Sequence, residues 1–593
     1  MEYCYFLVND CVHEISIMCN TKISIQLSIT VRQFKSYFYN QSSINNFKIH
    51  DLNLFPHMKY LVANRYCTSV SLFTNLIALD VSNSMLITYI DTLTNLRDLY
   101  LSTNEFIEDI NNLINLTKLF LCSSSYVTNI TNLTKLRDLI LHKSVNTISG
   151  LVNLESLKVG YCEPTLGNFS KLTLLHMKYC QLDNIQHFVN LLDFSLENQS
   201  KSLNITTFSK LTNLEIYDYT YETPVSLRFG NIDCVYFTNL ISMSISNNDI
   251  FNLDKLLQLQ SLILCNVYAS KLYKLTKLNI LSLINISSNK LRKLTSLYYL
   301  LLINSYTSDI QDLINLNTLH IEEKIESKKS LKLNLRKLTQ LTSLIFKANS
   351  VFPQNLSSLI NLKSLHLLNT YKIFGLKILT NLVYLEIKDV KDLDCISSLI
   401  NLTGLRIING KIKNISMCTN LYYLNLINQS KINNIYTLTK LTYLCLWNAS
   451  KIYKLENLIN LKNLFLNQIS LKHNKLYLPN LTELILKSDT GIRDISMMTG
   501  LINLSICNSE IHSVQNLYNL QNLELYYEEN REEYVTNLTK LTRLCIGSKC
   551  RVFGISNLRQ LEILDLQNDE DITHYENDLI LLKDLTVTFE RVY

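Results

Sequence analysis

The feature that most constrains this chain is a repeat of about 20 residues that runs through most of its length. The segment Leu93–Leu116, LTNLRDLYLSTNEFIEDINNLINL, contains one complete copy, with leucines at 93, 96, 99 and 101, then Asn104, then apolar residues at 107, 110 and 113. A single copy cannot bury its own apolar edge, because no second layer covers that edge. The copies must therefore stack on one another as the turns of a solenoid.

The copies follow the frame LxxLxxLxL. From Phe73 to Leu579 the frame takes 25 steps over 506 residues, which is about 20 residues a step. With the copy at Phe55, the sequence predicts about 27 repeats in one domain, residues 51–593. The first position of the frame falls at Phe55, Phe73, Leu93, Leu113, Leu133, Leu151, Phe169, Phe188, Phe208, Phe237, Leu256, Leu275, Leu294, Leu313, Leu338, Leu359, Leu379, Leu399, Cys418, Leu438, Leu458, Leu478, Met498, Leu517, Leu538, Leu558 and Leu579.

This frame resembles the leucine-rich repeat family, and most closely its short internalin-like and SDS22-like type, whose unit is LxxLTNLxxLxLxxNxIxxI. The resemblance covers about nine tenths of the chain. It implies an α/β solenoid with one long parallel β-sheet on the concave face and short 3₁₀ or irregular turns on the convex face. Such a resemblance is specific for the fold and leaves the function open.

The residues of each copy favour the same architecture. Side chains alternate along a strand, so the two leucines of LxL are expected to point into the core and the residue between them to point out. On the other side of the coil, Ile110, Leu113 and Leu116 recur at every third residue. This spacing favours short 3₁₀ turns over full helices, since only about 20 residues close the coil.

The asparagine of the repeat varies in position. Asn104, Asn248 and Asn349 stand three residues after LxL, where the chain leaves the strand and its inward amide groups need hydrogen-bond partners. Other copies have Ser or Cys there, and many carry an Asn one residue earlier. Either the earlier Asn satisfies the inward groups, or Ser and Cys do so less well. The earlier asparagines are Asn266, Asn285, Asn304, Asn409, Asn428, Asn448 and Asn508.

Residues 1–50 do not carry the repeat. Apolar residues at helical spacing predict two or three short helices, which would form an amino-terminal cap over the first turn of the solenoid. The segment also resembles a diverged F-box, with Val8 where a proline is usual. That resemblance implies docking onto the linker subunit of a cullin-type ubiquitin ligase. A cap alone and a cap that is also an F-box use the same helices, and both hypotheses stay open. The matching apolar positions are Leu7, Val12, Ile15, Val31 and Phe34.

Composition and charge narrow the class of partner. The formal net charge of +6 arises from 56 basic and 50 acidic side chains spread over 593 residues. The chain therefore lacks the strong positive electrostatic potential that would attract nucleic acid or an anionic membrane. The first residues do not resemble a secretory signal peptide, and no apolar run reaches the length of a membrane span. The 15 cysteines show no paired spacing and are expected to be reduced thiols. We therefore expect a cytoplasmic protein with no nucleic-acid or membrane partner.

No motif predicts catalysis, a metal or a cofactor. The 11 glycines of the chain form no phosphate-binding loop, and no spacing of Cys and His fits a zinc site. His176, His320 and His366 each take the outward position of LxL. The sequence places them on turns separated by many strands, so they are not expected to converge on one ligand. We expect a non-enzymatic protein.

The outward positions of the predicted sheet carry an apolar group. Tyr423 and Tyr443 occupy the same slot on adjacent turns, and Ile408, Ile427 and Trp447, the only tryptophan, occupy the slot after LxL on three successive turns. Adjacent strands place such side chains about 5 Å apart, which predicts an aromatic patch of the kind that anchors protein interfaces. The alternative is that this slot is partly buried where the strand turns, so that Trp447 belongs to the core. A second patch is predicted from Ile280, Ile284, Tyr299, Leu301 and Ile303.

The sequence thus predicts a protein-interaction module that captures a protein ligand on its concave face. In one form it is a substrate receptor of an SCF-type ubiquitin ligase, in which residues 1–50 dock onto the cullin-ligase linker subunit and the solenoid holds the target. In the other form it is a regulatory or structural scaffold that occupies a signalling enzyme, such as a phosphatase, without delivering it to a ligase. The sequence leaves both forms open.

Overall fold

The structure is a computed structural model that describes residues 59–588 with gaps. The predicted helical cap and F-box-like segment, residues 1–50, lie outside the described residues. Breaks of one to three residues occur between many strands. The longer gaps are 64–68, 199–204, 218–231, 324–333, 348–354, 369–372, 390–395, 429–433, 450–453 and 567–585.

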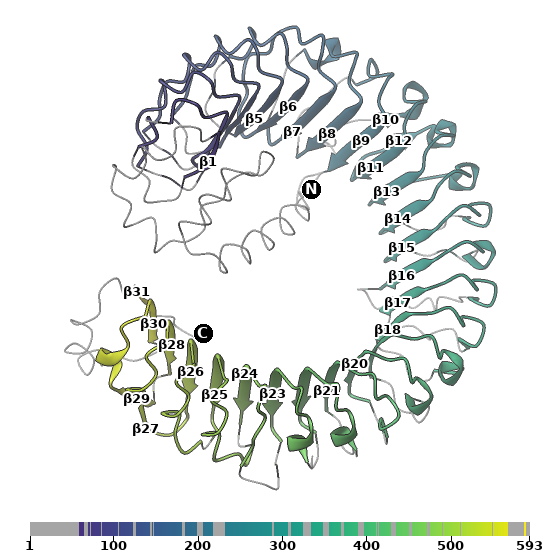
Figure 1. The fold of residues 1–593 in the computed structure, drawn as a ribbon. Helices are drawn as coiled ribbons and strands as arrows, with labels where there is room; N and C mark the ends of the chain where they lie inside the picture. Colours follow the sequence, from purple (N-terminus) through teal and green to yellow (C-terminus); the bar gives the residue numbers. More distant parts are fainter. Residues whose placement is uncertain are drawn as a thin grey trace. The chain divides into compact units, whose positions relative to one another are not determined.

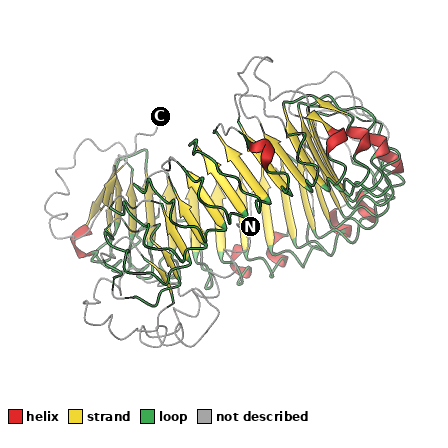
Figure 2. Ribbon diagram, turned by 90° about the horizontal axis from the view of Figure 1, so that it is seen from above, coloured by secondary structure: helices red, strands yellow, loops and turns green. Residues whose placement is uncertain are grey.

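The chain divides into two compact units, Met1–Asn289 and Lys290–Tyr593. In each unit, parallel strands form one side of the coil and the connections form the other (Figure 1). In the described part of the chain, the helical segments are single 3₁₀ turns within these connections (Figure 2). Each unit is therefore a parallel β-solenoid of short coils.

The described residues of the first unit form a main parallel sheet and one small additional pair of strands. Strands β10 (Ile232–Asp233) and β12 (Ile250–Phe251) form that pair. The main sheet contains β1 (Tyr60–Val62), β2 (Ala78–Asp80), β3 (Asp98–Leu101), β4 (Lys118–Leu121), β5 (Asp138–His142), β6 (Ser156–Gly160), β7 (Leu174–Lys178), β8 (Asp193–Glu197), β9 (Asn213–Tyr217), β11 (Ser242–Ser246), β13 (Ser261–Cys265) and β14 (Ile280–Ile284). The 3₁₀ turns are η1 (Ile185–His187), η3 (Cys234–Tyr236), η4 (Leu253–Lys255) and η5 (Leu272–Lys274).

The second unit repeats this plan. Strands β27 (Arg531–Tyr534) and β29 (Cys550–Phe553) form its additional pair. The main sheet contains β15 (Tyr299–Ile303), β16 (Thr318–Glu322), β17 (Ser343–Lys347), β18 (Ser364–Leu368), β19 (Tyr384–Lys388), β20 (Gly404–Ile408), β21 (Tyr423–Ile427), β22 (Tyr443–Trp447), β23 (Asn463–Asn467), β24 (Glu483–Lys487), β25 (Asn503–Cys507), β26 (Asn522–Tyr526), β28 (Arg543–Ile546), β30 (Ile563–Leu566) and β31 (Thr586–Thr588). The 3₁₀ turns are η6 (Ile310–Asp312), η7 (Leu376–Ile378), η8 (Ile396–Ser398), η9 (Ile435–Thr437), η10 (Leu455–Asn457) and η11 (Ile555–Asn557).

Successive strands pair in a constant register, so equivalent side chains of neighbouring turns lie next to one another. Tyr299 of β15 is opposite Thr318 of β16, and Leu300 is opposite Leu319. In β16 the side chains alternate, with Leu319 0% exposed and Ile321 1% exposed. The prediction that the leucines of LxL point inward is confirmed. Each fully buried leucine contributes about 2 kcal/mol of burial free energy, and the repeat supplies such residues in every turn.

The connections confirm the prediction of short 3₁₀ turns, and each turn buries an apolar residue, such as Ile435 in η9 and Leu455 in η10.

A second feature of this side of the coil is the asparagine of the LTNL segment. Asn115 donates from Nδ2 to the carbonyl oxygen of Thr94 in the preceding turn at 2.9 Å, and Lys135 donates to Asn115 Oδ1 at 2.7 Å. Within the described residues, no helix is long and apolar enough to cross a membrane.

The two kinds of asparagine have different roles. Asn104 is buried, and its Nδ2 donates to the carbonyl oxygens of Ser84 at 3.0 Å and Ile87 at 2.8 Å. Its Oδ1 accepts from the backbone N–H groups of Phe106 and Ile107, both at 3.0 Å. Asn104 therefore satisfies the inward groups where the chain leaves the strand.

The asparagines one residue earlier form a ladder at the surface. They directly follow the strands and adopt the left-handed conformation, with φ of 54° at Asn409, 55° at Asn428 and 49° at Asn448. Asn tolerates this conformation better than most residues. Asn428 Nδ2 donates to Asn409 Oδ1 at 2.6 Å, and Asn448 Nδ2 donates to Asn428 Oδ1 at 3.0 Å.

Cysteine takes part of the inward role in some turns. The thiol of Cys180 donates to the carbonyl oxygen of Val159 at 3.5 Å, and that of Cys162 donates to Leu141 at 3.9 Å. Because a thiol is a weak hydrogen-bond donor, a cysteine at this position satisfies only part of the backbone groups that Asn104 satisfies in its turn.

Candidate functional site

All eight residues predicted to bind a partner lie in the second unit, at outward positions of their strands. The first, third and fifth residues of each strand point away from the core, because the second and fourth are buried. We call this surface the sheet face. The eight residues are Tyr299, Leu301 and Ile303 on β15, Ile408 on β20, Tyr423 and Ile427 on β21, and Tyr443 and Trp447 on β22.

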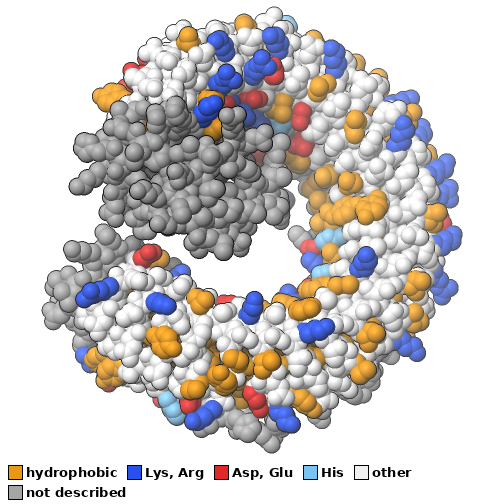
Figure 3. All heavy atoms as spheres, viewed as in Figure 1, with side chains coloured by type: hydrophobic (Ala, Val, Ile, Leu, Met, Phe, Trp, Pro, Cys, Tyr) orange, Lys and Arg blue, Asp and Glu red, His pale blue; other side chains and the backbone are white. Residues whose placement is uncertain are grey.

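The structure brings Tyr423 and Tyr443 into direct contact. These residues are opposite each other on β21 and β22, and their rings stack with centroids 4.7 Å apart and planes 16° apart. Figure 3 shows hydrophobic side chains at the surface of the second unit. The predicted pair is thus a continuous aromatic surface.

Trp447 is at the surface. Its side chain is 42% exposed, whereas its neighbour Leu446 is 0% exposed. Ile427 is opposite Trp447, and Ile408 is opposite Ile427, so the three form one row across β20, β21 and β22. The alternative in which Trp447 belongs to the core is wrong. We call Ile408, Ile427 and Trp447 the apolar row.

Tyr384 on β19 extends the tyrosine pair, and sequence reasoning missed it. It occupies the same slot as Tyr423, but Gly404 lies between them on β20. A Cβ atom at Gly404 would lie 2.6 Å from Cδ2 of Tyr384, so the glycine provides the space over which the tyrosine ring leans. Comparing the same strand position on β19, β20 and β21, despite the glycine on β20, would have identified Tyr384. We call Tyr384, Tyr423 and Tyr443 the tyrosine row.

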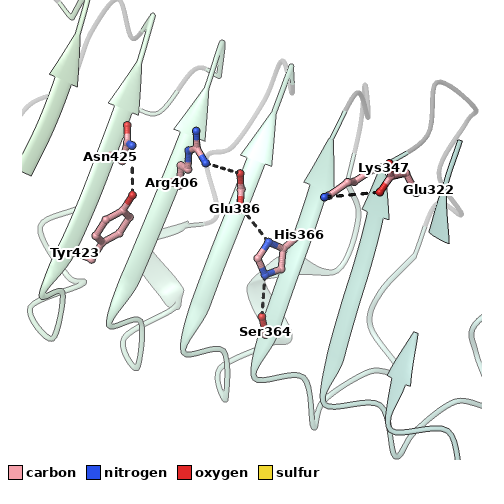
Figure 4. A network of polar contacts seen from close by, with 8 residues as sticks. All are labelled: Glu322, Lys347, Ser364, His366, Glu386, Arg406, Tyr423 and Asn425. Atoms are coloured by element: carbon pink, nitrogen blue, oxygen red, sulfur yellow. Dashed lines mark hydrogen bonds and ion pairs between the residues drawn. The ribbon is translucent and has the colours of Figure 1, made fainter. Parts of the chain in front are cut away.

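A polar network lies between the tyrosine row and the apolar row, at the middle outward position of the strands (Figure 4). Glu386 is its centre. It contacts His366 Nδ1 through Oε2 at 3.0 Å and Arg406 Nη1 through Oε1 at 3.2 Å. The Nε2 atom of His366 lies 3.1 Å from Ser364 Oγ. The hydrogen bond with His366, aided by the charge of Arg406, lowers the pKa of Glu386 although burial opposes this shift.

The network continues onto β21 and β22 as uncharged residues. Asn425 is 8% exposed and donates from Nδ2 to the hydroxyl oxygen of Tyr423 at 3.3 Å. Cys445 is 7% exposed, and burial raises the pKa of its thiol to about 11. The middle position is thus more buried here than the rows on either side, and it carries no reactive thiolate at neutral pH.

The hydroxyl groups of Tyr384 and Tyr443 remain protonated at neutral pH. Burial raises the pKa of Tyr384 and the pKa of Tyr443 above the usual value for tyrosine. At neutral pH both residues are therefore hydrogen-bond donors as well as apolar surface.

The predicted group on β15 is less extensive. Tyr299, Leu301 and Ile303 point outward, but their partners on β16 are Thr318, His320 and Glu322. In the second unit this apolar group is therefore limited to one strand. The other members of the predicted patch, Ile280 and Ile284, lie on β14 of the first unit.

The prediction about the histidines needs a correction. His320 on β16 and His366 on β18 have only β17 between them, so they are not separated by many strands. The two residues are 46 positions apart in the sequence, little more than two repeats of about 20 residues, and distance along a solenoid depends on turns rather than residues. His320 lies 3.5 Å from Glu322, whereas His366 contacts Glu386. Over the described part of the chain, no group of three or more His, Cys, Asp and Glu side chains is placed to hold a metal ion.

The first unit has an aromatic pair that the sequence analysis did not single out. Tyr161 and Tyr179 stack with centroids 5.0 Å apart and planes 14° apart, and they are 47% and 45% exposed. Both are in the left-handed conformation, with φ of 58° and 48°. They occupy the position that Asn holds in the surface ladder, where a bulky residue is costly. The signal in the sequence is a Tyr two residues after LxL.

These features define the fold of leucine-rich repeat proteins: a 20-residue frame, one short parallel strand per turn, and 3₁₀ connections. No protein-family model and no curated protein sequence matches the chain. Several solved structures resemble it at low identity.

One is the leucine-rich repeat ectodomain of the plant membrane receptor kinase GASSHO1/SCHENGEN3 from Arabidopsis thaliana, in complex with CASPARIAN STRIP INTEGRITY FACTOR 2. It is 18% identical over 90% of this chain and 76% of that chain, with a TM-score of 0.45. The functional domain of InlJ from Listeria monocytogenes is 19% identical over 61% of this chain and 75% of that chain, with a TM-score of 0.38. The Leptospira interrogans protein LIC12759 is 17% identical over 84% of this chain and 96% of that chain, with a TM-score of 0.27. These likenesses are distant, and we infer no function from them.

Proposed function

We propose that this chain is a non-enzymatic protein-interaction module that captures a protein ligand on the sheet face of its second unit. The observation that carries the proposal is the stacked Tyr423–Tyr443 pair together with the half-exposed Trp447 at the other end of the same strand as Tyr443. Tyr, Trp and Arg are the residues enriched at the energetic centres of protein interfaces. Here Arg406 lies between the tyrosine row and the apolar row, so all three types share one surface.

The pairing of charges supports the same function. Glu386 is bonded to both His366 and Arg406, and the side chain of Glu386 is only 16% exposed. These bonds hold Arg406 in place between the rows, so little side-chain entropy remains to be lost when a partner binds. A pre-organised surface of this kind suits recognition of a protein.

A site-specific crosslink tests the proposal. A photo-crosslinking amino acid replaces Lys487 on β24, an exposed residue two strands from Trp447 and about 10 Å away. A control protein carries it at Tyr477, an exposed residue in a connection of the same unit. We expect a covalent protein adduct in cells from position 487 and not from position 477. The same adducts from both positions, or none from position 487, would contradict the proposal.

For residues 1–50 we propose that the F-box-like segment docks onto the cullin-ligase linker subunit, which would make the protein a cytoplasmic SCF-type substrate receptor. The resemblance at Leu7, Val12, Ile15, Val31 and Phe34 supports this form. The alternative is a scaffold that binds a signalling enzyme, such as a phosphatase, without a ligase. A pull-down of purified linker subunit by the full-length protein separates the two. Retention that is lost in Phe34→Ala supports the receptor, and no retention supports the scaffold.

A further inference from the structure

We propose that the apolar row, together with a lysine at each of its ends, binds an extended segment of the partner that has apolar side chains in its middle and a carboxylate at each end. This inference rests on the proposed function, because it names the chemistry of the segment that the same sheet face captures. Three features carry it: the order of residues along the row, the state of the nearby charges and the amide ladder beside the row.

The apolar row has a cation at each end of its own strand position. At one end, Lys388 on β19 is opposite Ile408. At the other end, Trp447 is opposite Asn467 on β23, and Asn467 is opposite Lys487 on β24. Between the two lysines this position contains three apolar residues and one amide, and no carboxylate. A ligand with an acid, an apolar centre and a second acid is complementary to this order.

Both lysines lack a counter-ion. In the described part of the chain, no carboxylate lies within ion-pair distance of Lys388 or Lys487. The ammonium group of Lys487 lies 5.9 Å from the centre of the Phe465 ring, so its side chain extends along the sheet face. A carboxylate of the ligand would gain a partner at each end of the row, whereas a Lys or Arg there would be repelled.

The acids on the same two strands, or next to them, are bonded to other groups. Each contacts a basic or amide side chain of a neighbouring turn and forms no ion pair with the two lysines. These pairs are Glu386 with Arg406, Asp389 with Asn409, and Glu483 with Asn463. The fold therefore supplies no carboxylate for the ends of the row, and a ligand has to bring its own.

The surface ladder of asparagines suits the backbone of a peptide. Asn409, Asn428 and Asn448 directly follow the three residues of the apolar row, so the ladder runs beside it, and their side chains are exposed. Each amide nitrogen uses one hydrogen in the ladder and keeps a second, and each amide oxygen keeps a lone pair. A peptide backbone has both N–H and C=O groups to meet them, whereas a lipid acyl chain has neither.

The number of strands sets the length of the segment. Lys388 and Lys487 are five strand positions apart, which is about 24 Å along the sheet. An extended chain covers about 3.3 Å per residue, so about seven residues span the two backbone positions. Because lysine side chains are long and flexible, the surface selects the order of charges and tolerates a change of one or two residues in length.

The test uses the full-length protein and three capped nonapeptides with the same apolar centre. The acidic peptide is Asp-Asp-Val-Ser-Leu-Ser-Val-Asp-Asp, and the neutral and basic peptides have Asn or Lys in place of Asp. Trp447 is the only tryptophan, so its fluorescence reports on the row without a label. We expect the acidic peptide to shift the Trp447 emission to shorter wavelength in a saturable manner. The neutral peptide should bind about fivefold more weakly, as expected for two lost ion pairs, and the basic peptide more weakly still.

A reversal of charge at both ends of the row should exchange this preference. Lys388→Glu combined with Lys487→Glu keeps Trp447 and should bind the basic peptide more tightly than the acidic one. The matched control, Lys377→Glu combined with Lys462→Glu, makes the same change in net charge at two exposed lysines outside the sheet face and should keep the wild-type preference. Circular dichroism confirms that each variant folds.

An anionic membrane is the rival ligand, and vesicles of phosphatidylcholine and phosphatidylserine in equal parts test it. We expect no shift of the Trp447 emission with these vesicles, because the apolar row is one residue wide and has polar groups beside it. A saturable shift would assign the row to a membrane surface and overturn the inference.

Three further outcomes would overturn it: no saturable shift with the acidic peptide, equal binding of the acidic and basic peptides, or an unchanged preference in the charge-reversed variant. The crosslinker at position 487 replaces only one lysine and should weaken capture about threefold. A protein adduct from that position combined with any of these outcomes would leave the proposed function standing and remove only the acidic ligand. Saturable binding of the acidic peptide without an adduct would do the reverse.

Discussion

The ring of Tyr423 stacks on the ring of Tyr443 at 4.7 Å, while the leucines that follow them, Leu424 and Leu444, are fully buried. Adjacent residues of one strand thus have different roles, since alternate side chains point to opposite sides of the sheet. The inward residues hold the turns together, and the outward residues are free to make a surface.

The contrast between Leu446 and Trp447 gives a first prediction. Leu446→Ala should destabilise the second unit by about 2–5 kcal/mol, because it leaves a cavity in the core at a residue that is 0% exposed. Trp447→Ala should cost about 1 kcal/mol or less, since its side chain is 42% exposed. Urea unfolding followed by circular dichroism measures both, and hydrogen exchange of β21–β23 localises the effect. Equal costs would show that Trp447 is part of the core.

The two kinds of asparagine give a second prediction. Asn104→Ala should destabilise the first unit by about 2 kcal/mol or more, because it leaves buried backbone groups without partners. Asn428→Ala should cost about 1 kcal/mol, mainly because alanine is strained at a φ of 55°. Asn428→Gly should recover most of that loss, since glycine adopts this conformation freely. Thermal unfolding of the three variants checks this order, and a larger loss in Asn428→Gly than in Asn428→Ala would refute it.

Glu386 gives a prediction about pH. The hydrogen bond with His366, together with the charges of Arg406 and Lys347, holds the pKa of Glu386 below its ordinary value. A carboxyl group with a lowered folded-state pKa stabilises the fold above its unfolded pKa of about 4.3 and loses that contribution as the pH falls through the folded pKa. The difference in unfolding temperature between the wild type and Glu386→Gln should therefore shrink between about pH 5 and pH 3. A difference that grows toward low pH would contradict the assignment.

The buried thiols give a fourth prediction. Burial raises the pKa to about 12 at Cys180 and at Cys550, and to about 11 at Cys418. At pH 8 only about one thousandth or less of each is thiolate, and the thiolate is the form that reacts with iodoacetamide. Mass spectrometry should find these residues unmodified in the native protein and fully alkylated in urea. Rapid native alkylation at Cys180 would show that its turn opens.

Much of the fold follows from the sequence alone. Periodic leucines determine the strands, the inward positions and the 3₁₀ connections, because a 20-residue coil has few ways to bury them. The frame also placed Tyr423, Tyr443 and Trp447 on the correct strands. The repeat frame did not predict that the side chain of Trp447 is exposed, because exposure depends on how far each side chain extends beyond its neighbours.

Two relationships were missed for physical reasons. Tyr384 was not joined to Tyr423 because a glycine interrupts the slot, and only the structure shows the ring leaning over Gly404. His320 and His366 were grouped with the remote His176, although only β17 lies between their strands. In a solenoid, proximity depends on the number of turns between two residues, so each pair has to be counted separately.

The most direct test of the account is one protein with two readouts, Tyr443→Ala combined with Trp447→Ala, measured for partner capture and for thermal unfolding. The matched control combines Tyr477→Ala with Tyr518→Ala, two tyrosines that are 53% and 52% exposed in connections of the same unit. We predict that the sheet-face variant loses the captured protein while its unfolding temperature stays close to that of the control. Undiminished capture, or a large drop in unfolding temperature, would show that these aromatic residues do not form a binding surface.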